Sequence, residues 1–122
     1  MSTQGWVGFD FDGTLARYDS WKLQGNELGE PVWPMVDRMF EYVQQGREVR
    51  IVTARVAPHR SGEEVEVQRT LVENWCRLYL GKVFPITHCK AYAMELLYDD
   101  RVVAVEANTG RILGGPGVVG WE

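Results

Sequence analysis

The sequence contains few cysteines, no excess of basic residues and no long apolar run. Its two cysteines, Cys76 and Cys89, lack the spacing of metal ligands, so we expect two reduced thiols in a cytoplasmic protein. No apolar run approaches the length that crosses a bilayer. Residues 1–4 show neither the basic start nor the apolar core of a signal peptide. The sequence therefore predicts a protein without a membrane partner.

The charge balance limits the class of substrate. A formal net charge of −4 gives the chain no general basic field that would attract a polynucleotide, although a local basic patch would suffice for a short contact. The 122 residues, 45% hydrophobic and 25% charged, are typical of one globular domain. We expect a single domain over residues 1–122, and the sequence leaves its oligomeric state undetermined.

The most informative stretch is an apolar run from Trp6 that ends in Asp10-Phe11-Asp12-Gly13-Thr14-Leu15. The run is typical of a buried parallel strand. Residues two apart in extended chain point to the same side, so both carboxylates can face one small volume at the strand's carboxyl end. Buried acids are costly without a cationic partner, so this pair indicates a metal ion, a phosphate site or both. The alternative is an ordinary Asp-Gly turn.

The rest of the chain alternates helices and strands. We expect a helix from about Pro31 to Gly46, a strand over 48–53, a helix over 63–80 and a short strand over 83–86. Residues 16–29 should form a loop or small flap anchored by Tyr18 and Trp21, too short to be a cap domain. Residues 112–122, rich in glycine, should form a loosely ordered tail. This alternation predicts an α/β fold, a Rossmann-like three-layer sandwich with a central parallel sheet.

Polar residues follow other apolar runs in the same way. Thr53 closes the strand over 48–53, and Arg55 and Arg60 follow it, where guanidinium groups could hold an anionic group of a substrate. The run Leu96-Leu97-Tyr98 ends in a second acidic pair, Asp99-Asp100. Ligands of parallel sheets bind at the carboxyl ends of the strands, where all these residues fall.

The order of these motifs resembles the haloacid-dehalogenase-like (HAD) phosphohydrolases over most of the chain. Asp10 and Asp12 match the first motif, Thr53 the second, a lysine the third, and Asp99 with Asp100 the fourth. Lys90 is the preferred lysine and Lys82 the alternative, because spacing in this region varies. The Asp-Asp-Arg form of the last motif and the short loop after Asp12 are most similar to capless members, such as the phosphatase domain of phage polynucleotide kinases.

The resemblance implies a mechanism. Asp10 would attack phosphorus and form an aspartyl-phosphate, and Asp12 would protonate the leaving oxygen and then activate water. Thr53 and Lys90 would contact the transferring phosphoryl group, and Gly13 and Thr14 would help to bind it. One Mg²⁺ would be held by Asp10, the backbone carbonyl of Asp12 and the final acid pair, with Asp100 preferred over Asp99 as the direct ligand.

These expectations describe a magnesium-dependent phosphatase of phosphomonoesters. An uncapped site would admit a phosphate at the end of a bulky molecule, so a nucleotide or a polynucleotide end is the favoured substrate over a small metabolite. Two alternatives stay open: a non-catalytic phosphate- or partner-binding module on the same fold, and a phosphotransferase with an acceptor other than water.

Overall fold

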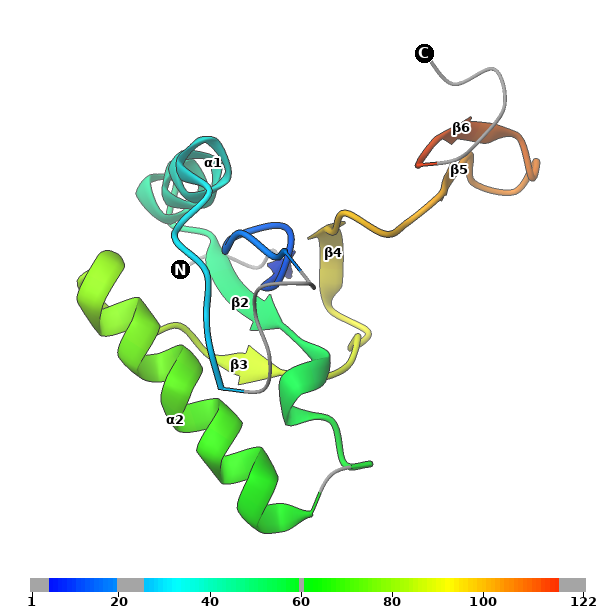
Figure 1. Cartoon of the computed structure of the whole chain (residues 1–122). Coiled ribbons are helices and arrows are strands. Elements are labelled where there is room, and N and C mark those ends of the chain that lie inside the picture. Colours follow the sequence, from blue (N-terminus) through cyan, green and yellow to red (C-terminus); the bar gives the residue numbers. More distant parts are fainter. Residues whose placement is uncertain (1–4, 20–25, 60, 117–122) are drawn as a thin grey trace.

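The computed structural model describes residues 5–19, 26–59 and 61–116 of the chain (Figure 1). Trp21 and Arg60 lie outside the described residues. Along the chain the elements are β1 (Trp6–Asp10), α1 (Trp33–Gln44), β2 (Glu48–Val52), a 3₁₀ turn (Ala54–Val56), α2 (Gly62–Tyr79), β3 (Ile86–Thr87), β4 (Met94–Tyr98), β5 (Ala104–Val105) and β6 (Ile112–Gly114).

The first four strands form one parallel sheet in the order β3-β2-β1-β4. The strand β1 is therefore central, with β2 on one side and β4 on the other. Phe9 lies opposite Ile51 of β2 and Tyr98 of β4, so the three strands end at the same edge. This register brings Asp10, Thr53 and Asp99 to one place, although 88 residues of chain lie between the first and the last.

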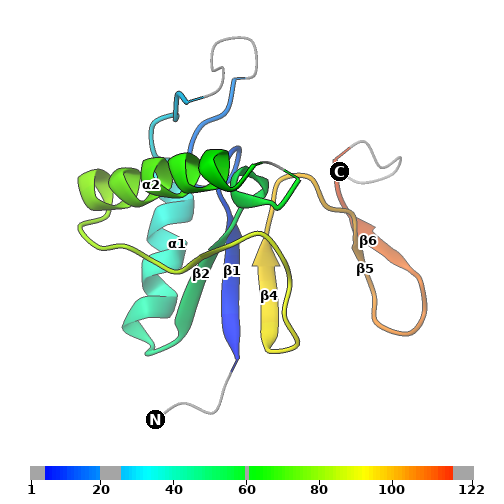
Figure 2. The same cartoon turned by 90° about the horizontal axis from the view of Figure 1, so that it is seen from below.

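The hydrophobic core lies on the sheet face that carries Val7 and Phe9. From β1 the chain passes to its neighbour β2 and then to β3, so it crosses the sheet in one direction. Because such crossovers are right-handed, the helices of both connections lie on the same face. Figure 2 shows α1 and α2 together beside the sheet. Phe9 packs edge-on against Tyr42 of α1, and Phe11 packs edge-on against Trp75 of α2. The hydrophobic core on this face stabilises the fold, and the polar residues lie at the carboxyl ends of the strands.

Side chains of the sheet cover its opposite face. Trp6 is buried there beneath the guanidinium of Arg50, whose carbon lies 4.5 Å from the ring centre. Trp6, Val52 and Leu97 all surround Gly8, where an added Cβ would lie 3.0 Å from two of them. The connection from β3 to β4 forms no helix, so the described residues place none on this face. The α/β class with a central parallel sheet is confirmed, and no described segment forms a large cap. The third layer of the expected sandwich is absent from the described residues, because both of their helices lie on one side of the sheet.

Three local predictions were wrong in part. The apolar stripe expected on α2 included Val67, Leu78 and Tyr79, which are exposed; the buried positions are instead Gln68, Val72, Trp75 and Cys76. The third strand lies at Ile86–Thr87, later than expected, because its hydrogen bonds to β2 begin at Pro85.

The segment expected as a loose tail begins with a strand. Residues Ile112–Gly114 pair antiparallel with Ala104–Val105, and the turn between them passes through Asn108 and Gly110, both at positive φ. The hairpin β5–β6 stands apart from the parallel sheet (Figures 1 and 2). Residues 117–122 of the predicted tail lie outside the described residues.

No helix in the described part of the chain is both long and apolar enough to span a membrane. Cys76 is buried in the core, Cys89 is exposed, and neither forms a disulfide.

Candidate active site

The loop that follows β1 folds back on itself directly after Asp10. The N–H groups of Leu15 and Ala16 both donate to the carbonyl of Phe11, at 3.0 Å each. Gly13 has φ +89°, the left-handed region that the sequence predicted for a sharp turn. A Cβ at this position would lie 2.5 Å from a carboxylate oxygen of Asp100. Gly13 is therefore required twice, for its backbone conformation and for the close approach of Asp100.

Three carboxylates meet at the ends of β1 and β4. Asp10, Asp99 and Asp100 each place an oxygen within 4.8 Å of the other two. The hydroxyl of Thr14, buried beneath the cluster, lies 3.4 Å from Asp10 and 3.3 Å from Asp100, so it can donate its one proton to either. The Oδ1 atom of Asp99 accepts from the backbone N–H of Arg101 at 2.9 Å. Thr14 and the turn at Arg101 thus fix the cluster from two sides.

This crowding changes the acidity of Asp10. The pKa of its carboxyl is raised to about 7, most by burial and then by the charge of Asp99 and the hydrogen bond and charge of Asp100, while the N–H of Phe11 opposes the rise. The cluster therefore contains more negative charge than its surroundings neutralise. Three hard oxygen donors with uncompensated charge fit a small divalent cation such as Mg²⁺.

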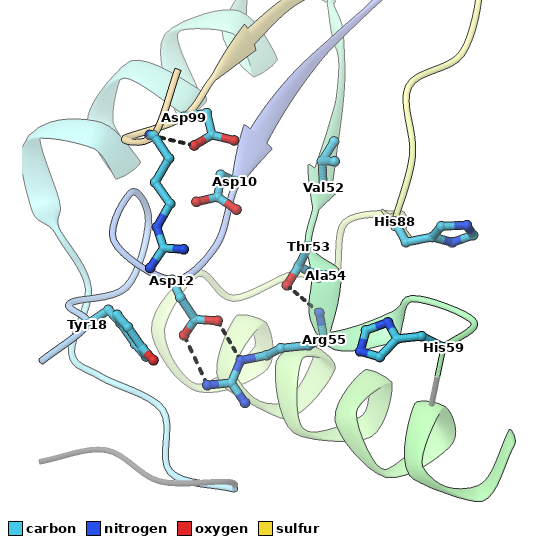
Figure 3. A pocket seen from close by; sticks show the side chains of 11 residues that line it. Asp10, Asp12, Tyr18, Val52, Thr53, Ala54, Arg55, His59, His88 and Asp99 are labelled. Carbon is cyan, nitrogen blue, oxygen red and sulfur yellow. Dashed lines mark hydrogen bonds and ion pairs between the residues drawn. The ribbon is translucent and has the colours of Figure 1, made fainter. Parts of the chain in front are cut away.

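Asp12 lies in a different electrostatic environment, although it is only two residues away. Its carboxylate accepts two hydrogen bonds from the guanidinium of Arg55, at 2.6 Å from Nε and 3.0 Å from Nη2 (Figure 3). Both side chains are largely shielded, with 11% of Arg55 and 21% of Asp12 exposed. A bidentate pair of this kind fixes the orientation of the carboxylate as well as its position.

Arg55 reaches Asp12 because of the turn that follows β2. Thr53 ends the strand with its N–H bonded to the carbonyl of Thr87 at 2.8 Å, and its hydroxyl accepts the N–H of Arg55 at 3.2 Å. This contact caps the 3₁₀ turn over Ala54–Val56. Because the Thr53 hydroxyl accepts there, its own proton stays available for an oxygen in the cavity.

These side chains border a cavity of about 570 Å³ at the carboxyl edge of the sheet. Figure 3 shows Asp10 and Asp99 together, the Asp12–Arg55 pair beside them, and His59 and His88 at the other side of the view. No described segment forms a cap over it. The cavity is lined by Asp10, Asp12, Tyr18, Val52, Thr53, Ala54, Arg55, His59, His88, Asp99 and Arg101.

Most of the residues that the sequence singled out come together here. Gly13, Thr14 and Asp100 are not part of the lining, but they contact one another directly beside it: Asp100 lies against Gly13 and 3.3 Å from the Thr14 hydroxyl. Lys90 does not: it is exposed and is not part of the lining. The amino group of Lys82 lies 5.0 Å from the ring of Phe84, also away from the lining.

Several lining residues were not predicted as site residues. Arg101 brings a cation to the cavity, and His88 directly follows β3. Both stand at strand ends, the signal used for Thr53 and Asp99, so the same rule could have found them. His59 lies in a loop, and no sequence signal marked it. Tyr18 was expected only as an anchor of the flap, and it lines the cavity.

Comparison with known proteins supports the fold. No protein-family model and no curated protein matches the chain. Among solved structures, a conserved protein coded by a locus of Bacteroides thetaiotaomicron is similar, with a TM-score of 0.53 and 18% sequence identity over 83% of this chain and 79% of that chain. At this identity the likeness shows the fold alone.

Proposed function

We propose that this chain is a magnesium-dependent phosphohydrolase that cleaves phosphomonoesters through an aspartyl-phosphate on Asp10. The observation that carries the proposal is the contrast between two carboxylates two residues apart. Asp10 lies among acids and Asp12 lies against a guanidinium, and both line the same cavity. Paired acids placed in unlike environments are typical of sites that divide nucleophilic and acid–base roles.

The residues divide the reaction into two steps. A carboxylate oxygen of Asp10 attacks phosphorus and the bond to the leaving oxygen breaks, while Asp12 in its protonated form gives that oxygen its proton and becomes the carboxylate that Arg55 holds. In the second step Asp12 takes a proton from water, which attacks the phosphoryl group and releases phosphate and the free Asp10 carboxylate. The Thr53 hydroxyl donates to a phosphoryl oxygen throughout. These roles follow the HAD resemblance and are supported by the meeting of the three side chains at one cavity.

The acidic cluster would hold the metal. Asp10, Asp100 and Asp99 provide carboxylate oxygens, and the backbone carbonyl of Asp12 is the further ligand that the resemblance implies. When bound, Mg²⁺ supplies positive charge that lets the Asp10 carboxylate and a phosphate dianion come together. The cation expected opposite the metal is Lys90 by resemblance, whereas the arginines that line the cavity are Arg101 and Arg55, the second of which holds Asp12.

A nucleotide or a polynucleotide end is the proposed substrate. The cavity is open, and basic or titratable side chains of Arg101, His59 and His88 line it. Such a rim favours a phosphate attached to a larger anionic body, and it offers few contacts that would select among small phosphate esters. The net charge of −4 favours an end-on contact over a long groove.

The test is phosphate release by the purified protein with and without Mg²⁺. The panel contains a 3′-phosphorylated oligonucleotide, a mononucleotide, a sugar phosphate and p-nitrophenyl phosphate. We expect metal-dependent release that Asp10→Asn abolishes and that the surface variant Asp37→Asn leaves intact. Absence of release from every substrate, or full activity in excess chelator, would refute the phosphohydrolase. A clear preference for the sugar phosphate would refute the proposed substrate, and transfer of phosphate to an added alcohol in place of release would indicate a transferase.

A further inference from the structure

Gln68 is a polar residue in the apolar face of α2. Its side chain is 5% exposed, and its neighbours on that face are Val72, Trp75 and Cys76. A buried amide in such a position costs stability unless its donor and acceptor atoms are both satisfied. Here both are, since Oε1 accepts from Nη1 of Arg55 at 2.8 Å and Nε2 donates to Oδ1 of Asn26 at 2.9 Å.

The chemistry of the partners fixes the direction of these bonds. A guanidinium only donates, so the amide oxygen of Gln68 must face Arg55 and its NH₂ group must face Asn26. Asn26 in turn must present its oxygen. The contacts therefore form a directed series from the segment at Asn26, through Gln68 and Arg55, to the carboxylate of Asp12.

Gln68 restricts the position of the guanidinium. The Nε and Nη2 atoms of Arg55 hold Asp12, Nη1 is held by Gln68, and Nη2 also donates to the carbonyl of Glu27 at 3.3 Å. Without the acceptor on Gln68, Nη1 would lose this hydrogen bond, and the orientation of the guanidinium would be less restricted. The orientation of the Asp12 carboxylate toward the cavity depends on that guanidinium.

We propose that Gln68 is a positioning residue that acts through Arg55 to hold Asp12 in place for proton transfer, and that links this geometry to the backbone and side chain at Asn26 and Glu27. The catalytic part of this inference rests on the proposed phosphohydrolase function. Gln68 itself lies outside the cavity lining, so its effect passes through Arg55. Losing it should impair the protonation of the leaving group and spare the binding of the phosphate.

The first test is spectroscopic and needs no turnover. The Nε–H resonance of Arg55, assigned in ¹⁵N-labelled protein with the help of Arg55→Lys, should be slowly exchanging in the wild type because Nε–H is bonded to Asp12. Gln68→Met keeps the length of the side chain and removes both hydrogen bonds. In this variant we expect the resonance to shift and its exchange with water to rise about tenfold or more. Val72→Ala, a core change on the same helix at a side chain that cannot hydrogen-bond to Arg55, is the matched control and should leave the resonance in place.

The second test compares leaving groups. General-acid assistance is worth roughly 10²- to 10⁴-fold, and a good leaving group needs little of it. Gln68→Met should therefore lower kcat for an alkyl phosphate at least about tenfold and for p-nitrophenyl phosphate much less, with similar KM values. Asn26→Ala, which removes only the outer bond, should show a weaker form of the same difference. Val72→Ala should lower stability without changing the ratio between the two substrates.

The outcomes separate the two proposals. An unchanged Arg55 resonance in Gln68→Met, or equal losses on both substrates, would overturn the role of Gln68 while the phosphohydrolase stands. Absence of wild-type turnover together with a shifted Arg55 resonance would overturn the phosphohydrolase and with it the catalytic role of Gln68, and would leave only the structural link to Arg55.

Discussion

Replacing Asp10 with asparagine should abolish turnover and, at the same time, stabilise the metal-free protein at alkaline pH. The pKa of Asp10 is raised from 3.8 to about 7 by burial and by the neighbouring acids. Folding therefore favours the protonated carboxyl. The contribution to stability is fully present below the unfolded pKa of 3.8 and is lost as pH rises through about 7. Above that pH the folded protein holds a charge that it stabilises poorly.

The magnitude follows from the size of this shift. Roughly three pKa units at 1.36 kcal/mol each give an upper limit of about 4 kcal/mol between pH 4 and pH 8.5. Asp10 is only partly buried, and solvent screens its interaction with the exposed Asp100. We therefore expect about 1–2 kcal/mol, or roughly 4–8 °C in Tm for a chain of this size. The asparagine amide keeps the shape of the side chain and offers N–H donors to the two other carboxylates.

The assay is thermal unfolding in chelator from about pH 5 to about pH 8.5. The wild-type Tm should fall across this range by more than that of Asp10→Asn, and the variant should be the more stable protein at the alkaline end. Asp37→Asn removes one negative charge from the exposed surface of α1, so it controls for the change in net charge. Adding Mg²⁺ at about pH 8.5 should raise the Tm of the wild type and of the control, because the metal binds the ionised cluster in the folded state alone. Asp10→Asn should lose most of that gain.

Two results would refute this reasoning. If the Tm of the wild type and that of Asp10→Asn changed equally with pH, ionisation of the cluster would not destabilise the folded protein. Equal stabilisation of both proteins by Mg²⁺ would mean that the metal binds elsewhere. Neither result depends on turnover, so the electrostatic analysis of the cluster is tested separately from the phosphohydrolase.

Three further predictions concern single residues of the site. Asp100→Asn should weaken the dependence of turnover on Mg²⁺, raising the metal concentration for half-maximal activity more than about tenfold, and Ca²⁺ should substitute poorly because its coordination is larger and looser. Arg101→Ala should lower turnover by roughly 10²-fold, and Lys90→Ala should lower it less, since of these two residues Arg101 alone lines the cavity; the reverse order would identify Lys90 as the site lysine that the HAD resemblance implies. Gly13→Ala should lower the free energy of unfolding by about 2–3 kcal/mol and also weaken Mg²⁺ binding. The control Gly46→Ala, at φ +77° with open space around it, should lower stability less and leave Mg²⁺ binding unchanged. Equal effects of the two substitutions would exclude the contact with Asp100 as the cause.

The strand ends were predictable from the sequence because the pattern there is local. An apolar run that stops at a carboxylate or hydroxyl predicts both a strand and the location of its polar residue, and this rule correctly grouped Asp10, Thr53 and Asp99. Parallel strands of one sheet end at one edge whatever their order. The approximate site could thus be predicted without knowing which strands are neighbours.

The helical face of α2 could not be predicted in the same way. Apolar periodicity selected Val67 and Leu78, which are exposed, and passed over Gln68, which is buried. The helix is rotated so that an amide reaches Arg55, and this arrangement depends on a partner 13 residues earlier in the chain. A prediction from hydrophobic patterning assumes that every buried position is apolar. It is therefore wrong where a hydrogen-bonded polar side chain is buried in place of a valine.

The third motif shows the limit of assigning a residue by type and spacing. A lysine was sought before the acid pair, and two lysines satisfied the loose spacing, with Lys90 preferred over Lys82. The structure places neither on the cavity and places Arg101, one residue beyond the acid pair, on its lining. Sequence order alone cannot distinguish these cations, because the local direction of the backbone decides whether a long arginine or lysine side chain extends into the cavity or away from it.

The unlike environments of Asp10 and Asp12 follow from the position of β1 in the sheet. A strand at the centre has a different neighbour on each side, and here β4 ends in acids whereas β2 ends in a turn that presents Arg55. Asp10, still in the strand, lies beside the acids of β4. Asp12, beyond the strand, has been turned toward Arg55 by the loop that Gly13 permits. If β1 were an edge strand, one of these neighbours would be missing, and the two carboxylates would share a single environment. The strand order β3-β2-β1-β4 thus makes two residues of the same type chemically distinct, and the proposed two-step reaction would use that difference.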